Sequence, residues 1–459
     1  MGNFWDFSAW GAFNLFAVLL SSLLAANMLK RSIPFLRASL IPTSVLGGGV
    51  LIIVAAIYKA ITGDVMFDAP IFGKSGTAML EVITYHTLAL GFIASTLKTS
   101  DTKLTKQRTV EIFNTGVTTV STYLIQGIVG LGITLIAAMI LTGFFPAAGV
   151  LLPFGFGQGT GQAMNYGNIY EVDYGFIGGK SFGLTIAALG FLSASIGGVI
   201  HLNVMKKRGR LPQKTTGDQL NNERIEEENE IPMQESIDKI TVQIALVFVA
   251  YLVAYGLMAL LGILLPGMKS TIYGFNFILG VLAATLVKTV LKWLNKTRLV
   301  RRNHTNNFLL TRVSNFFFDV MVVAGIAAIR LDVLESYWGL MLILGAAGLV
   351  VTYIYNRIVA KVLFKEYPEE QFMAMYGMLT GTASTGIILL REIDGDFKTP
   401  AADNMVYQNF PAIAFGFPMM LLASLAPKKP VLTLIIFVAF FAVMNVILFR
   451  RFIFRRKKK

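Results

Sequence analysis

The chain has 459 residues, of which 55% are hydrophobic and only 14% are charged, against about a quarter charged in soluble domains. Its mean hydropathy is +0.64. It contains no cysteine, which excludes disulfides, thiolate metal sites and cysteine nucleophiles, and its three histidines lack metal-ligand spacing. The net charge of +14 does not indicate nucleic-acid binding, because the basic residues cluster at the ends of apolar runs.

The apolar runs predict an all-α polytopic membrane protein. Several runs exceed the roughly 18 apolar residues that cross a bilayer, and they do not alternate as barrel strands do. We expect helices over residues 7–29, 42–60, 78–97, 110–141, 176–205, 240–265, 271–291, 313–331, 337–364, 403–425 and 431–449.

Two polar, glycine-rich segments interrupt this series. The first, LLPFGFGQGTGQAMNYGNIYE, begins at Leu151, and the second, YGMLTGTASTGIILLREIDGDF, begins at Tyr376. Irregular backbone at membrane depth must line a protein cavity, because lipid cannot satisfy its N–H and C=O groups. We therefore expect two re-entrant loops, at about 146–170 and 372–392. Both contain Gly-Thr, at Gly159 and Gly381, followed by Glu-x-Asp and then Phe.

The distribution of lysine and arginine predicts the topology. Basic clusters follow the expected helices that end near residues 29, 97, 205, 291 and 449, which places those ends in the cytoplasm and the N-terminus outside. Five helices plus one loop then repeat with opposite orientation, the inverted repeat of secondary transporters. The expected parts are a first repeat at 1–205, a cytoplasmic flexible linker at 206–239, a second repeat at 240–425, and an extra helix with a basic tail at 426–459.

The candidate substrate and ion site lies in the two loops. Glycine lets the backbone approach a ligand, broken helices direct N–H groups at an anion, and hydroxyl and carbonyl oxygens suit sodium. The alternative role for these glycines is close helix packing. The candidate residues are Gly157, Gln158, Gly159, Thr160, Gly161, Asn165, Thr380, Gly381, Thr382, Ser384 and Thr385.

Three ionisable residues near or within spans are further candidates. His86 is a possible ligand or a neutral packing residue. Asp319 could bind a cation or pair with a basic side chain. Arg391 could hold a substrate carboxylate or act as a cytoplasmic topology determinant.

The chain resembles the bacterial sodium/glutamate symporters. The likeness rests on the Gly-x-Gly-Thr-Gly segment, on FGLTIAALGFLSASIGGVI from Phe182 to Ile200, and on the five-plus-five layout with two loops. Where the family often has Gly-Gly-His-Gly-Thr, this chain has Gln158 in place of the histidine, and its second loop matches the family pattern imperfectly. The resemblance implies sodium-coupled uptake of glutamate or a related anion, a homodimer, an elevator-like movement, and a multi-pass protein of the bacterial inner membrane.

Other functions remain open at this point. The same fold could carry a different carboxylate with sodium, or serve as a channel or sensor. Paired, oppositely oriented loops favour alternating access over a pore. An enzyme is not expected, because the sequence offers no catalytic constellation.

Overall fold

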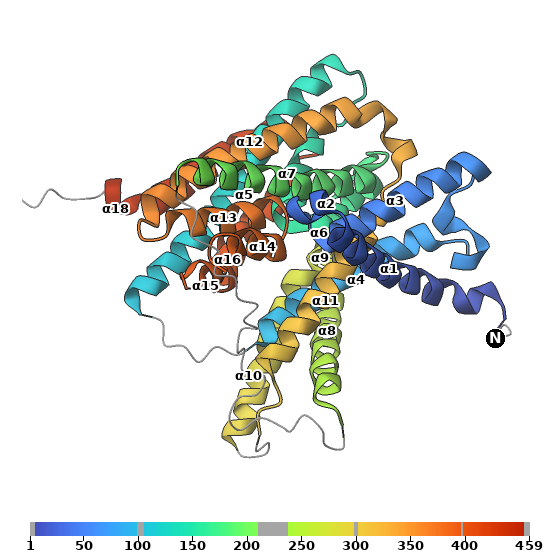
Figure 1. Ribbon diagram of the computed structural model, residues 1–459, viewed down its shortest axis with the longest axis horizontal. Helices are drawn as coiled ribbons and strands as arrows, with labels where there is room; N and C mark the ends of the chain where they lie inside the picture. The colour runs from blue at the N-terminus through green and yellow to red at the C-terminus, as the bar shows by residue number, and fades with distance from the viewer. Residues whose placement is uncertain (1–4, 99–104, 210–236, 298–301, 396–397, 454–459) are drawn as a thin grey trace, which may run out of the picture. The chain divides into compact units, whose positions relative to one another are not determined.

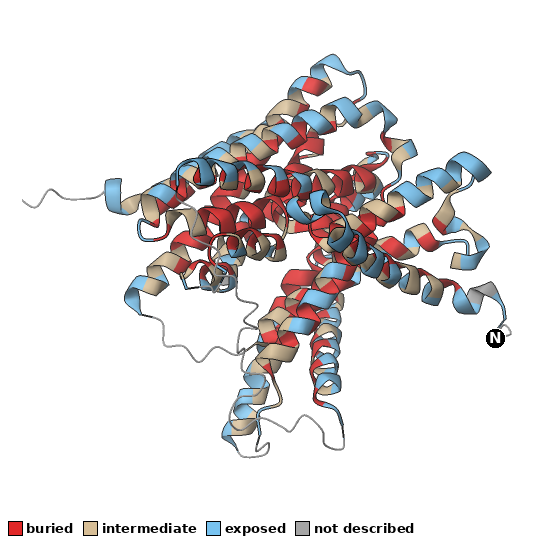
Figure 2. Cartoon of the chain, in the orientation of Figure 1, coloured by how far each residue is buried: buried red, intermediate tan, exposed pale blue. Residues whose placement is uncertain are grey.

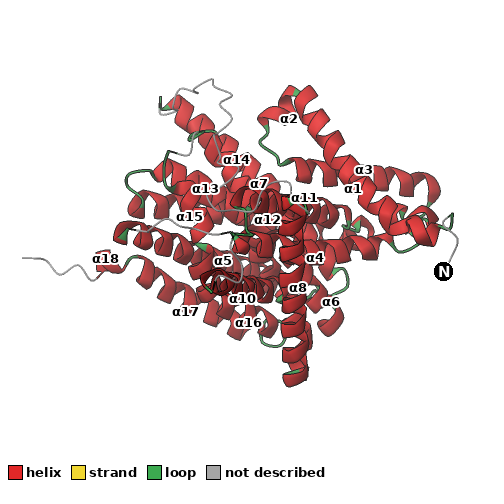
Figure 3. Cartoon of the chain, turned by 90° about the horizontal axis from the view of Figure 1, so that it is seen from below, coloured by secondary structure: helices red, strands yellow, loops and turns green. Residues whose placement is uncertain are grey.

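The computed structural model describes residues 5–98, 105–209, 237–297, 302–395 and 398–453. Within these ranges the chain is helical and contains no strand (Figure 3). The described helices include ten that are long and apolar enough to cross a membrane, or eleven if one bent pair counts as a span. The predicted all-α polytopic fold is confirmed. Of the predicted linker, residues 210–236 lie outside the described ranges, as do residues 454–459 of the predicted tail.

The bent pair is the span expected at 403–425. It consists of α15 (Ala401–Tyr407) and α16 (Asn409–Leu425), and the two are inclined by 52°. Pro411 lies in the first turn of α16 and has no N–H to donate to the preceding turn. The proline therefore accounts for the break in an otherwise apolar span.

The described helices divide between two compact units, and Figure 1 labels most of them. In the first unit, a core of Leu90, Ile93, Val247, Leu310 and Val313 joins three helices that are distant in sequence. This unit contains α1 (Phe7–Ser32) through Phe16, η2 (Pro70–Phe72), α4 (Gly76–Leu97), α8 (Lys239–Leu264), η4 (Pro266–Met268), α9 (Lys269–Gly274), α10 (Asn276–Lys296) and α11 (Asn307–Ala327) through Ala324.

The second unit holds both glycine-rich segments. Its buried residues concentrate in the glycine-rich helices and their neighbours, shown red in Figure 2. Besides α15, α16 and the remainder of α1 and α11, it contains α2 (Pro34–Ala38), α3 (Thr43–Thr62), α5 (Lys106–Ile140), η3 (Pro146–Val150), α6 (Leu151–Tyr174), α7 (Gly179–Lys207), η5 (Leu331–Tyr337), α12 (Trp338–Leu363), α13 (Pro368–Thr380), α14 (Ala383–Arg391), α17 (Pro430–Leu448) and α18 (Arg450–Ile453); η1 (Met66–Asp68) is divided between the units.

Each unit takes helices from both sides of the predicted linker. The compact units therefore do not coincide with the two predicted repeats. What matters for the site is that α5, α6, α7, α12, α13 and α14 all belong to the second unit.

Candidate substrate and ion site

The helix α6 folds back on itself at Gly159. This residue has φ 78° and ψ −172°, a conformation that only glycine adopts readily, and it divides α6 into two limbs. Phe154 and Tyr166 lie on opposite limbs, yet their rings stack with centroids 3.9 Å apart. In an unbroken helix the two positions would be about 18 Å apart. The first segment, expected as a loop, is therefore a helical hairpin with non-helical backbone at one residue.

The second glycine-rich segment is also a helical hairpin. α13 ends at Thr380, Gly381 and Thr382 are non-helical, and α14 begins at the next residue. The two helices touch at glycines, because a Cβ on Gly377 would lie 2.8 Å from the Cα of Gly386. Both segments, expected as loops, contain non-helical backbone at only one or two residues, and the surrounding backbone is more regular than its glycine content suggests.

The two breaks meet on α7. A Cβ on Gly190 would lie 2.6 Å from the carbonyl oxygen of Thr380 and 3.2 Å from the Cα of Phe156. The first hairpin therefore contacts α7 where the second does, and any larger residue at Gly190 would separate them. On the next residue of α7, the ring of Phe191 lies 3.0 Å from where a Cβ on Gly381 would be.

The helix α5 braces both breaks. The Tyr123 hydroxyl donates to the carbonyl oxygen of Gly157 at 3.0 Å, and the Gln126 amide donates to that of Leu379 at 2.9 Å. Each carbonyl lies in the last turn before a break, where helix carbonyls lose their intrahelical donors. Two side chains one helical turn apart on α5 thus hold the ends of both hairpins' first limbs.

Polar side chains at the first break have unused hydrogen-bonding capacity. Both amide atoms of Gln158 are buried and have no hydrogen-bond partner among the described residues. The same is true of Nε2 of Gln162, whose Oε1 accepts from the Asn165 amide at 3.0 Å. Thr160 is fully buried and packs against Gly325 of α11. A buried amide without a partner is costly, so this environment favours a polar ligand.

Each break also starts a new helix. The second limb of α6 begins at Thr160, and α14 begins at Ala383. The first N–H groups of a helix have no intrahelical acceptor, and the helix dipole attracts negative charge there. Two helix N-termini thus lie beside one stretch of α7. The predicted residues at the two breaks and their adjoining turns are Gly157, Gln158, Gly159, Thr160, Gly161, Thr380, Gly381, Thr382, Ser384 and Thr385.

A family comparison decides the class of protein. The family model for the sodium/glutamate symporter matches residues 9–399, which include both hairpins. This chain belongs to the sodium/glutamate symporter family. A search among curated proteins gives no match. The family couples the transport of glutamate to sodium and is a family of transporters. Sodium is therefore cargo, carried with the organic substrate.

Three further predicted residues are not at the breaks of the second unit of this symporter. Arg391 is exposed at the far end of α14, about 12 Å along the helix from its first residue. His86 and Asp319 belong to the first unit, outside the unit that holds the hairpins. There the His86 ring is 2.6 Å from the Tyr251 hydroxyl, and the Asp319 residue is exposed.

The sequence analysis missed the contribution of α5. Besides Tyr123 and Gln126, this helix presents Thr115 and Thr119, whose hydroxyls contact Gln371 of α13 at 3.3 Å and Gln408 at 2.9 Å. The signal was present in the run TGVTTVSTYLIQG from Thr115, which is unusually polar for the middle of a span.

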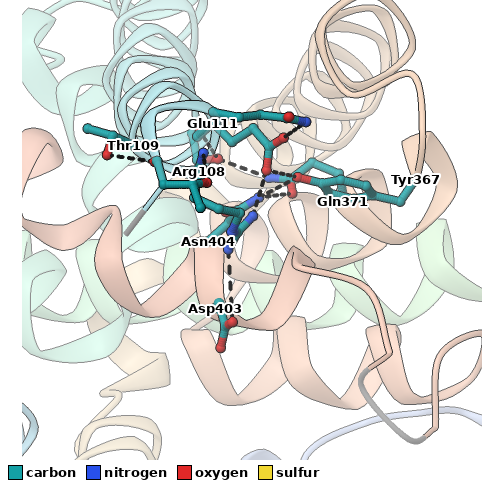
Figure 4. A network of polar contacts seen from close by, with 10 residues as sticks. Arg108, Thr109, Glu111, Tyr367, Gln371, Asp403 and Asn404 are labelled. Carbon is teal, nitrogen blue, oxygen red and sulfur yellow. Dashed lines mark hydrogen bonds and ion pairs between the residues drawn. The ribbon is translucent and has the colours of Figure 1, made fainter. Parts of the chain in front are cut away.

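A further network of polar side chains lies at the start of α5 (Figure 4). The Tyr367 hydroxyl donates to Glu111 at 2.7 Å, and Arg108 pairs with the same carboxylate at 2.6 Å. The Asn404 amide reaches both the Tyr367 hydroxyl, at 3.1 Å, and Oε1 of Gln371, at 2.9 Å. The network joins α5 to the start of α13 and to α15, so α13 is fixed to α5 at both of its ends.

A half-buried ion pair fixes the same end of α13 to two further helices. Glu369 accepts two hydrogen bonds from Arg357 of α12, at 2.5 and 2.6 Å, and one contact from His201 of α7, at 2.8 Å. Burial alone would raise the pKa of Glu369, but the bonds from Arg357 and His201 hold it below its ordinary value. The first limb of this hairpin is thus anchored on three helices.

Proposed function

We propose that the two hairpin breaks of the second unit form the site at which this symporter binds glutamate. The observation that carries the proposal is that two helices begin at breaks that meet on the same part of α7. Glutamate has two carboxylates, and each helix N-terminus suits one of them. The unpartnered amide of Gln158 supplies an oxygen and a donor for the polar remainder of the substrate.

Hydroxyls at the second break complete this proposal. The hydroxyl oxygens of Thr382 and Thr385 are 3.3 Å apart at the start of α14, and Thr380 is buried at the end of α13. The Thr382 and Thr385 hydroxyls can donate to a carboxylate without adding fixed charge. The Thr380 hydroxyl donates to the carbonyl of Tyr376, so its oxygen can only accept. None of the predicted site residues at the breaks is itself charged, so net charge at the site changes only with the cargo.

For the transport cycle we propose alternating access with an elevator-like component. The second unit holds both hairpins and the first unit holds neither. Movement of one compact unit against the other would then carry the site between the two faces of the membrane. The accompanying proposals are an N-terminus outside, a cytoplasmic C-terminus, a bacterial inner membrane and a homodimer; the distribution of basic residues supports the orientation.

The test is uptake of labelled substrate by proteoliposomes containing the purified chain. We expect sodium-dependent accumulation of glutamate, and loss of uptake in Thr160→Ala and in Thr382→Ala. Thr433→Ala is the matched control, because Thr433 is buried on α17 and its hydroxyl bonds only within its own helix, to Lys429. Wild-type uptake in both test variants would remove the breaks from the site.

The substrate panel should include other dicarboxylates and acidic amino acids. Accumulation of one of these compounds instead of glutamate would leave the proposed site unchanged but would change its substrate. Gln158, which replaces the histidine common in the family, is the residue that makes such a change of substrate relevant. Uptake driven by a proton gradient without sodium would contradict the coupling. Single-channel conductance without accumulation would contradict transport.

A further inference from the structure

The helices α5 and α12 exchange hydrogen bonds in a reciprocal pattern. The amide nitrogen of Gln126 on α5 donates to the Thr352 hydroxyl on α12 at 2.8 Å. The amide nitrogen of Asn356 on α12 donates to the Thr122 hydroxyl on α5 at 3.4 Å. Each helix thus contributes a threonine and, four residues later, an amide, and each amide reaches the other helix's threonine. Because 126 pairs with 352 and 122 with 356, the helices run antiparallel here.

Neighbouring carbonyls fix the orientation of both amides. The same nitrogen of Gln126 donates to the carbonyl oxygen of Leu379, and the nitrogen of Asn356 donates to that of Thr352 at 3.0 Å. A carbonyl oxygen only accepts, so neither amide can be turned over without losing a bond. The amide oxygens, Oε1 of Gln126 and Oδ1 of Asn356, must therefore face elsewhere.

Neither oxygen meets a donor in the part of the chain that the structure describes. Gln126 is 0% exposed and Asn356 is 1% exposed, so both amide oxygens are buried deep in the unit. Nearly all buried polar groups in proteins are satisfied. Two unsatisfied acceptors on one pair of crossing helices are therefore available to a ligand that interacts with oxygen.

The chemistry of the surroundings favours a cation over a water molecule. The Thr122 hydroxyl donates its proton to the carbonyl of Thr118 at 2.8 Å, so its oxygen is available only as an acceptor. A water here could donate to the amide oxygens, but neither of the two amide nitrogens nor the Thr122 hydroxyl has a proton left for the oxygen of the water. A cation requires only oxygen ligands. These oxygens belong to amides and hydroxyls and are neutral, which suits a monovalent hard ion better than Ca²⁺ or Mg²⁺, whose sites use carboxylates.

We propose that the crossing of α5 and α12 binds a sodium ion through the amide oxygens of Gln126 and Asn356. This inference rests on the proposed sodium-coupled function and places an ion beside the hairpin breaks, whereas the sequence suggested sodium within the glycine-rich segments themselves. Gln126 connects the two sites, because its nitrogen holds Leu379, two residues before the break at Gly381. In the predicted repeat, α5 and α12 correspond to the fourth expected helix of each half, so the ion would lie between equivalent motifs.

The test is a sodium titration of thermal stability in the purified full chain, at constant ionic strength with choline as the replacement cation. Ligand binding to the folded state raises the melting temperature, and the midpoint of the rise reports the apparent sodium affinity. We expect the midpoint to increase at least about tenfold in Asn356→Leu. This substitution keeps the size of the side chain and leaves no neighbouring amide unpaired. Potassium should not substitute for sodium in the wild type.

Asn445→Leu is the matched control. The nitrogen of Asn445 donates to the Phe441 carbonyl at 2.8 Å and its oxygen accepts from Tyr355 at 2.9 Å, so this amide is satisfied. Its sodium midpoint should stay at the wild-type value. An unchanged midpoint in Asn356→Leu would overturn the proposal and leave a structural water as the occupant.

Asn356→Asp keeps the test decisive if the leucine variant does not fold. A buried carboxyl must lose its proton to bind a cation, so the sodium midpoint of this variant should fall as the pH rises, unlike that of the wild type. A midpoint that depends on pH no more than the wild-type midpoint would refute the ion site. Glutamate uptake by the wild type separates the two ideas: sodium-dependent uptake with a normal Asn356→Leu titration rejects only this site, whereas uptake without sodium rejects the coupling itself.

Discussion

Replacing Gly159 with alanine tests the hairpin of α6 most directly. At φ 78° and ψ −172° the residue occupies a region that side chains avoid, at a cost of up to about 3 kcal/mol. Alanine also lowers the conformational entropy of the unfolded chain, which raises the free energy of unfolding by about 0.7 kcal/mol. The expected net loss in the free energy of unfolding is therefore about 2 kcal/mol, or a factor of about 30 in the folding equilibrium.

Gly175→Ala provides the comparison. Gly175 also has a positive φ, 72°, but its ψ of 21° lies in the left-handed helical region, and an added Cβ would meet no atom within 4 Å. Alanine visits this region at a cost of about 1 kcal/mol, which the unfolded-state effect nearly offsets.

The assay is denaturant unfolding of both variants in detergent, followed by uptake in proteoliposomes. Gly159→Ala should be clearly less stable than Gly175→Ala and should not transport, because relaxation of the strain would straighten the hairpin. Equal stability of the two variants, or full transport by Gly159→Ala, would refute the account of α6.

Three further outcomes are expected. Tyr123→Phe should lower the free energy of unfolding by about 1 kcal/mol, since it leaves the Gly157 carbonyl without its donor. It should also slow uptake more than the control Tyr174→Phe, which removes a longer hydrogen bond at the end of α6. Equal uptake by both variants would contradict the bracing role of α5. Glu369→Gln should cost about 1 to 2 kcal/mol, because Arg357 loses the charge of its partner in a half-buried site. The folded-state pKa of Glu369 is lowered, so its contribution to stability is present above the ordinary value of 4.5 and is lost as the pH falls through the lowered pKa; wild type and Glu369→Gln should therefore converge in acid titrations of stability. Since the chain has no cysteine, Ser384→Cys gives a single thiol whose labelling should be slowed by sodium plus glutamate, whereas labelling of exposed Thr62→Cys should not change; unprotected Ser384→Cys would place the substrate elsewhere.

The spans and the two breaks could be predicted because their signals are local. An apolar run long enough to cross a bilayer is visible in the sequence, as is a glycine at a position that needs positive φ, such as Gly159. The helical structure of the hairpin limbs could not be predicted from the sequence, because it is stabilised by packing of one helix against another. Gly377 and Gly386, poor helix formers by propensity, allow α13 and α14 to approach each other, and that contact stabilises both helices.

The hydrogen bonds from α5 to the two breaks could not be predicted for a different reason. A threonine or glutamine within an apolar run can face lipid, a neighbouring helix or a cavity, and the sequence does not say which. Only the fold brings Gln126 to Leu379 and Asn356 to Thr122, across more than half of the chain. The residues proposed to bind sodium are thus brought together by tertiary contacts, and no short motif contains them.

If the breaks bind cargo as proposed, their common bracing by α5 would make the two cargoes thermodynamically dependent on each other. One helical turn, from Tyr123 to Gln126, holds a carbonyl from each hairpin. Glutamate at the breaks and sodium beside Gln126 would then each change the free energy of binding of the other. Linkage requires this effect to be reciprocal: if sodium raises the affinity for glutamate by some factor, glutamate raises the affinity for sodium by the same factor. Partly loaded states would then be sparsely populated, which limits leakage of either cargo alone.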